Sequence, residues 1–398
     1  MTTIDLTEAT ARRALGSLVD DSENAVSRYA RALWSALIEP GDRVAGELVA
    51  AVGAARALEI AMTDAGPLRE AVDIDALELV KGRARWQPRL GGAAEALETA
   101  RRADVRLVTP DHFAWPARAN DLGPFAPVCL WLQGDPGRLV EGVGTVAIVG
   151  ARASTAYGEQ VAADLAAGAV AAGVTVYSGA AYGIDAAAHT AALSAGGRTV
   201  AVMAGGLDRP YPTGNRRMIE QIARTGAVVA EVPCGSAPTK HRFLGRNRLI
   251  AAFGDATVVV EAGWRSGALN TAHHAQAIGR PVGAVPGPVT SASSMGCHRL
   301  LREGAVECVT GPADLLELAG VSEAPLPPVP AGYIDESTRV RDAVSARGAR
   351  ATADIARRAG LAVDETAALL GILELEGVVT RRGAGWVQLA GRTAATLW

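Results

Sequence analysis

The feature that most constrains the fold is a series of short apolar segments between Val146 and Gly287, most of which end at a glycine-rich turn followed by an Ala-rich stretch. The segments do not alternate apolar with polar residues, which is typical of strands buried on both faces, and the stretches between them can form the covering helices. The pattern therefore predicts one parallel sheet in an open α/β fold. The segments begin at Val146, Val174, Thr199, Val228, Thr257 and Pro281.

The carboxyl ends of these predicted strands carry small, polar or charged residues, and in open α/β sheets this edge binds ligands. The turn from Gly150 to Ser154 leads into a helical stretch, so its backbone N–H groups can hold an anion beside the positive charge of Arg152. A tight turn without a ligand is the alternative. The turn is not a G-x-G-x-x-G motif. At the end of the second strand, where dinucleotide-binding proteins carry an Asp or Glu that binds the ribose hydroxyl, this chain has Ser178-Gly179. Both observations disfavour a dinucleotide site.

The strongest local charge signal is the segment from Pro238 to Arg248, which holds cations, one histidine and Phe243 but no acid. Because it lies between the fourth and fifth strands, we predict a basic loop at the ligand-binding edge of the sheet. The segment favours phosphate binding combined with base stacking on a single strand. A solvated charged face is the alternative. The cations are Lys240, Arg242, Arg246 and Arg248, and aromatic residues in nearby turns are Tyr157, Tyr182, Tyr211 and Trp264.

Composition bounds the remaining possibilities. The net charge of -3 gives no global sign of nucleic-acid binding, so any basic site must be local. The cysteines show neither metal-type pairing nor disulfide-scaffold spacing, which suits a reducing cytoplasm, and no stretch offers ~20 uncharged apolar residues, so we expect no membrane insertion. The titratable residues near the strand ends form no triad, metal cluster or Walker motif, so we expect no catalytic residue, metal or cofactor. These residues are Asp185, His189, Asp208, Glu231 and Glu261.

The chain is predicted to contain three domains and a linker. Residues 1–80 are rich in Ala, Leu, Val and charge and are predicted to form a small helical domain, and residues 81–322 contain the sheet. A Pro-rich linker occupies 323–335. Residues 336–398 hold three short helices and a hairpin, the order of a winged helix-turn-helix. Its third helix is acidic, so a protein-contact or structural role is favoured over duplex reading.

A set of motifs follows one another through the sheet region. They are Val149–Arg152, Ser178–Asp185, Gly206–Pro212, Phe243, Arg246–Ala251, Val260–Ala262, Ser266–Ala268 and Val285–Gly287. This series resembles the DprA (Smf) family of DNA-processing proteins, strongly so from about Val128 to Leu318. The resemblance implies an α/β fold with an extended Rossmann-like, mostly parallel sheet, an N-terminal helical (SAM-like) domain and a C-terminal winged-helix domain.

The resemblance also implies a function and a site. A member of this family would not be an enzyme: it would bind and protect single-stranded DNA in the cytoplasm, form a homodimer, and help load the RecA recombinase in natural transformation and recombination. Carried over to the matching positions, the DNA-binding residues would be Gly150, Arg152, Ser178, Gly179, Lys240, Arg242, Phe243, Arg246 and Asn247. The dimer would form through the closing strand and helix, which carry Val309, Leu315, Leu316 and Leu318.

Two other function classes remain as alternatives. One is a nucleotide-binding enzyme of the phosphoribohydrolase-like Rossmann group, which relies on a P-G-G-x-G-T loop followed by a catalytic Glu. The comparable stretch here, Glu261 to Ala268, lacks the Gly-Gly pair. The other is a transcription regulator that acts through the winged helix, against which the acidic third helix argues.

Overall fold

The computed structural model describes residues 4–19, 23–63, 75–140, 142–304, 306–321, 336–346, 348–375 and 377–389. It divides into two compact units, Met1–Ala324 and Pro325–Trp398, which are described separately. The Pro-rich linker predicted at 323–335 lies outside the described residues. No helix within the described ranges is long and apolar enough to cross a membrane.

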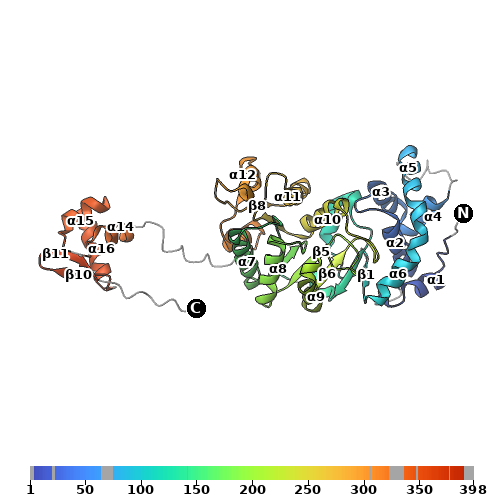
Figure 1. Ribbon diagram of the computed structural model, residues 1–398, viewed down its shortest axis with the longest axis horizontal. Helices are drawn as coiled ribbons and strands as arrows, with labels where there is room; N and C mark the ends of the chain where they lie inside the picture. Colours follow the sequence, from blue (N-terminus) through green and yellow to red (C-terminus); the bar gives the residue numbers. More distant parts are fainter. Residues whose placement is uncertain are drawn as a thin grey trace. The chain divides into compact units, whose positions relative to one another are not determined.

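The centre of the first unit is a sheet whose strands, as far as the chain is described, have the order β1-β2-β6-β5-β4-β3-β7-β8-β9 (Figure 1). Strands β3 to β9 are parallel to one another, whereas β2 pairs antiparallel with β6 and β1 antiparallel with β2. The predicted, mostly parallel sheet is confirmed. The strands are β1 (Arg106–Val108), β2 (Leu130–Gly134), β3 (Thr145–Val149), β4 (Thr175–Ser178), β5 (Thr199–Met203), β6 (Ala227–Ala230), β7 (Ala256–Val259), β8 (Val282–Ala284) and β9 (Glu307–Cys308).

Helices cover both faces of this sheet, as the apolar strands require. Successive strand residues point to opposite faces, so Val146 and Ile148 pack against α7, α8 and α13, whereas Ala147 and Val149 face α10 and α11. Helices α9 and α12 also pack their apolar residues against the sheet. The bounds are α7 (Ala156–Ala171), α8 (Ile184–Ser194), α9 (Arg216–Thr225), α10 (Lys240–Phe253), α11 (Gly267–Ala277), α12 (Met295–Arg302) and α13 (Pro312–Leu318).

The N-terminal helices pack beside the β1 edge of the sheet (Figure 1). Their centre holds two fully buried rings, Trp34 and Trp86, in an edge-to-face contact with centroids 5.1 Å apart. The same core continues to the sheet, where Trp131 donates a hydrogen bond to Ser35 Oγ at 3.2 Å. The helices are α1 (Glu8–Leu15), α2 (Ala25–Leu37), α3 (Arg43–Val52), α4 (Ala54–Met62), α5 (Ala76–Trp86) and α6 (Ala93–Arg102).

The second unit has the predicted order of three helices and a hairpin. Ile355, Leu370 and Trp386 lie in its own small core. Strands β10 and β11 pair antiparallel as the wing. This unit is a winged helix, as the sequence predicted. The elements are α14 (Glu336–Ala343), α15 (Thr352–Ala359), α16 (Val363–Leu375), β10 (Val379–Arg382) and β11 (Gly385–Gln388).

Candidate functional site

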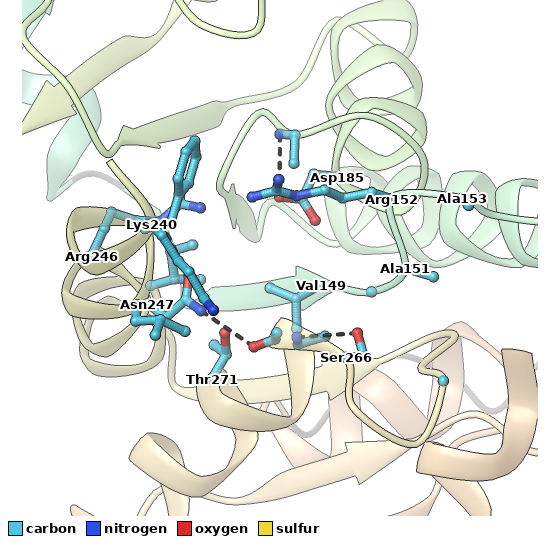
Figure 2. Close-up of a pocket in the computed structure, with 18 of the residues that line it drawn as sticks. Val149, Ala151, Arg152, Ala153, Asp185, Lys240, Arg246, Asn247, Ser266 and Thr271 are labelled. Atoms are coloured by element: carbon cyan, nitrogen blue, oxygen red, sulfur yellow. Dashed lines mark hydrogen bonds between the residues drawn. The ribbon is translucent and has the colours of Figure 1, made fainter. Parts of the chain in front are cut away.

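A pocket of about 950 Å³ lies at the carboxyl ends of β3 and β7. Strand β3 is the point where the strand order reverses, because the chain proceeds from β3 to β4 on one side and β7 lies on the other. In open α/β sheets, ligands bind at this topological switch point. Residues from the turn after β3, from α10 and from the start of α11 surround the pocket (Figure 2).

The turn after β3 is held in place by close packing and by hydrogen bonds. A Cβ atom at Gly150 would lie 2.5 Å from Ile184 Cγ1, so only glycine permits this approach. Thr155 caps α7 and donates to the carboxylate of Glu261 from its backbone N (2.9 Å) and its Oγ1 (2.6 Å). The Glu261 carboxylate therefore supports the turn. The side chain of Arg152, on the same turn, is exposed at the pocket rim.

The basic segment forms a helix, so the prediction of a loop was wrong. Thr239 caps α10 by accepting a hydrogen bond from Arg242 N at 3.3 Å, and the apolar residues toward its end are buried in the core. In a helix, residues three and four apart share a face. Lys240, Phe243 and Asn247 consequently line the pocket together.

An aromatic ring between cations marks the mouth of the pocket. The guanidinium carbon of Arg152 lies 4.6 Å from the centroid of the Phe243 ring, and Tyr211 lies against the same ring with centroids 5.8 Å apart. Arg152 and Lys240 are exposed, and neither forms an ion pair with a carboxylate of the described residues. The mouth of the pocket thus combines stacking surface with two uncompensated positive charges.

Arg246 lies beneath this mouth and is only 5% exposed. Its Nη1 donates to the carbonyl oxygens of Gly179 (2.9 Å) and Val202. Burial lowers the pKa of Arg246 to about 10, while the nearby carboxylate of Asp185 favours the charged form. A Cβ atom at Gly179 would lie 2.4 Å from the guanidinium, so any larger residue there would displace Arg246 from this position. Arg246 is therefore a structural support of the pocket floor, with its charge directed into the protein.

Asp185 completes this buried network. Its carboxylate accepts hydrogen bonds from the backbone N of Gly179 (3.1 Å) and of Ala181 (3.3 Å). Burial raises the pKa of Asp185, and the positive charge of Arg246 opposes that shift. Asp185 therefore fixes the turn after β4, which forms one side of the pocket.

Three of the predicted site residues lie outside the pocket lining. The Ser178 hydroxyl is fully buried and donates to Ile148 O at 2.6 Å, and Gly179 contacts Arg246. Arg242 forms a bidentate pair with Glu39 at 2.9 and 3.0 Å, which ties α10 to the N-terminal helices. The residues that the structure does bring to the pocket are Gly150, Arg152, Lys240, Phe243, Arg246 and Asn247.

Two further titratable residues near the strand ends, His189 and Asp208, also have structural partners. His189 is fully buried with its Nδ1 2.7 Å from Thr199 Oγ1, and burial lowers the pKa of His189 to about 3. Asp208 accepts a hydrogen bond from Gly235 N at 2.8 Å. Neither residue lines the pocket. Among the described residues, no group of acids, histidines or cysteines could hold a metal ion.

The start of α11 is a part of the site that the sequence prediction missed. Ser266 caps this helix by accepting from Ala268 N at 3.3 Å, and Ser266 and Gly267 both line the pocket. Asn247 donates to Gly267 O at 3.3 Å and so joins the middle of α10 to the start of α11. The repeated pattern of strand, glycine turn and helix after β7 was the signal that could have revealed this wall.

The fold and the pocket define a class: a Rossmann-like protein with a basic pocket, lined in part by aromatic residues, at the switch point of its sheet. The model of the family described as DNA recombination-mediator protein A matches residues 106–320, and that of the DprA winged helix domain matches residues 323–385. The chain belongs to the DprA (Smf) family, and its role is in DNA processing and recombination.

Individual relatives agree with this assignment. A DNA processing protein DprA of Mycobacterium tuberculosis is 48% identical over an alignment of 324 residues that covers 76% of this chain and 82% of that protein. Protein Smf of Escherichia coli is 34% identical over 299 residues, with coverages of 71% and 79%. The X-ray structure of DprA from Streptococcus pneumoniae is 30% identical with a TM-score of 0.58, and the match covers 73% of this chain and 97% of that one.

Proposed function

We propose that the chain binds single-stranded DNA in the pocket at the switch point. The observation that carries this proposal is the Phe243 ring, which lies against Arg152 and Tyr211 and shares a helix face with the uncompensated Lys240. A single strand can place an unstacked base on such a ring while its phosphates meet the cations, whereas the bases of a duplex are already stacked. Phosphate binding would also use the backbone N–H groups of the turn at Gly150.

We further propose that the chain protects incoming single strands, acts as a homodimer in the cytoplasm, and helps load the RecA recombinase. Family membership supports these proposals. The four side chains assigned to the dimer surface are at most 6% exposed and lie in the core, so a dimer contact through this strand and helix would have to use their exposed residues, such as Glu307 and Cys308. Light scattering that finds only monomers would contradict the dimer, and unchanged RecA filament formation on protein-coated strands would contradict loading. The four residues are Val309, Leu315, Leu316 and Leu318.

The salt dependence of binding should identify the phosphate contacts. If Arg152 and Lys240 each neutralise one phosphate, replacing either with alanine should reduce the slope of log affinity against log salt by about 0.7, the value per contact for a single strand. The measurement is titration of dT oligomers at several salt concentrations. Arg246→Ala provides the matched control, since its buried charge should leave the slope unchanged while the melting temperature falls. Unchanged affinity in both Arg152→Ala and Lys240→Ala would end the proposal.

A purified sample should show no turnover of nucleoside monophosphates, ATP or DNA. The carboxylate that a phosphoribohydrolase-like enzyme would need, Glu261, accepts hydrogen bonds from Thr155 and from Ser293 (3.2 Å), and it is 2% exposed. These contacts favour a supporting role over a catalytic one. Release of ribose 5-phosphate from a nucleoside monophosphate, abolished in Glu261→Gln with the fold intact, would favour the enzyme instead.

A further inference from the structure

A second hollow, of about 570 Å³, lies beside the pocket, between the segment after β7 and helix α12. Its central feature is Trp264, an indole that is 54% exposed. The guanidinium carbon of Arg299 lies 5.1 Å from the centroid of this ring. Val289, which is 87% exposed, lies at the rim. The hollow therefore offers an accessible aromatic surface beside a cation.

The two hollows share one continuous wall. Gly263 and Ser266 line the first pocket, whereas Trp264, between them in the sequence, lines the second. Backbone hydrogen bonds fix this wall to α12 and to the turn before it, because Gly296 N donates to Ala262 O at 2.7 Å and Ala262 N donates to Ser293 O at 2.8 Å. A ligand that leaves the first pocket over this wall meets Trp264.

The charges around Trp264 suit a polyanion. Glu303 lies 3.3 Å from Arg299 Nε, so this acid is already paired. His298 is held through Nε2, which lies 3.0 Å from Gly287 O. Arg302 is exposed and forms no ion pair with a carboxylate of the described residues. One cation that lines the hollow thus remains available for a phosphate.

We propose that the single strand continues from the first pocket into this hollow, where a second base stacks on Trp264 and Arg302 binds a phosphate. This inference rests on the proposed function of the first pocket. Continuity of the wall, the exposed ring and the unpaired cation favour the same strand as the occupant. If replacing Trp264 leaves the affinity for DNA unchanged, a protein partner would be favoured as the occupant of this hollow.

The test uses the full chain and dT oligomers of two lengths, about six and about 20 nucleotides, which bracket the usual site sizes of about 4–16 nucleotides for single-strand-binding modules. Trp264→Ala should weaken binding of the long oligomer about tenfold and leave the short one within about twofold. Phe243→Ala should weaken both. Trp264→Phe, which retains a ring, should keep most of the affinity for the long oligomer. Phe113→Ala removes another exposed ring outside both hollows and should change neither.

The outcomes separate the two ideas. If Phe243→Ala weakens both oligomers and Trp264→Ala weakens neither, the first site stands and the extension is wrong. If neither variant has any effect, the proposed function fails and the extension fails with it. If Trp264→Ala lowers the melting temperature, its effect on binding is not specific, and Arg302→Ala tests the extension instead. A salt slope reduced by about 0.7 for the long oligomer alone supports the extension. An unchanged slope overturns it.

Discussion

Replacing Arg248 with alanine is expected to lower the free energy of unfolding by about 3–5 kcal/mol, because it leaves a buried carboxylate without its partner. Arg248 is 4% exposed and Glu231 is 6% exposed. Two hydrogen bonds of 2.7 Å join the guanidinium to the carboxylate, and Nε donates to Phe125 O at 3.0 Å. Urea unfolding followed by circular dichroism measures the loss.

Arg242 provides the matched control in the same helix. Its pair with Glu39 is partly exposed, and Glu39 keeps a second partner, Arg89, at 3.0 Å. Arg242→Ala should therefore cost only about 0–1 kcal/mol, as partly screened surface pairs do. Substituting both members of the buried pair, as in Arg248→Met with Glu231→Leu, should recover part of the loss. Equal destabilisation by Arg248→Ala and Arg242→Ala would show that burial does not distinguish the two pairs.

The basic segment shows how far the roles of charged residues can be predicted from the sequence. Its four cations look alike in the sequence, yet the structure gives them different roles: Lys240 is exposed, Arg242 pairs with Glu39, and Arg246 and Arg248 are buried. Helical periodicity could have placed Lys240 and Phe243 on one face. The partners of the arginines could not be predicted, because they lie as far as 203 residues away along the chain.

The sheet was predictable for the opposite reason. The parallel strands from β3 to β8 are short, buried and largely apolar segments, so local pattern alone identifies them, whereas β9 is exposed. Domain limits within the first unit depend on contacts that local pattern does not show. The predicted boundary between residues 80 and 81 falls within α5, and the helical core reaches the sheet through Ser35 and Trp131. That boundary stays a prediction.

The switch-point pocket itself was partly predictable. The rule that ligands bind at the carboxyl ends of parallel strands correctly predicted that Gly150 and Arg152 lie at the pocket. Which residues face the ligand depended on details of three-dimensional packing. Ser178 ends its strand with the hydroxyl turned to Ile148 O, and the start of α11 enters the site only because β7 lies next to β3.

Phe243→Ala is expected to lower the affinity for single-stranded DNA by about 1–3 kcal/mol, roughly 5- to 150-fold, if a base stacks on its ring. The salt slope should stay unchanged, because stacking releases no counterions. Titration of a dT oligomer at several salt concentrations measures both quantities. A thermal melt of the same sample checks the fold, because Phe243 is partly buried on α10. A lower melting temperature with unchanged affinity would make Phe243 a core residue and remove the stacking site.

Combining Phe243→Ala with Arg152→Ala extends this test to the geometry of the pair. The Arg152 guanidinium lies 4.6 Å from the ring centroid, so the ring holds the cation that meets the phosphate. Contacting residues of this kind couple by about 0.5–3 kcal/mol. The double variant should therefore lose less affinity than the sum of the single losses. Lys240→Ala combined with Phe243→Ala is the matched pair without a cation–π contact, and its losses should add more closely. Full additivity in both pairs would mean that Arg152 and Phe243 act on the strand independently.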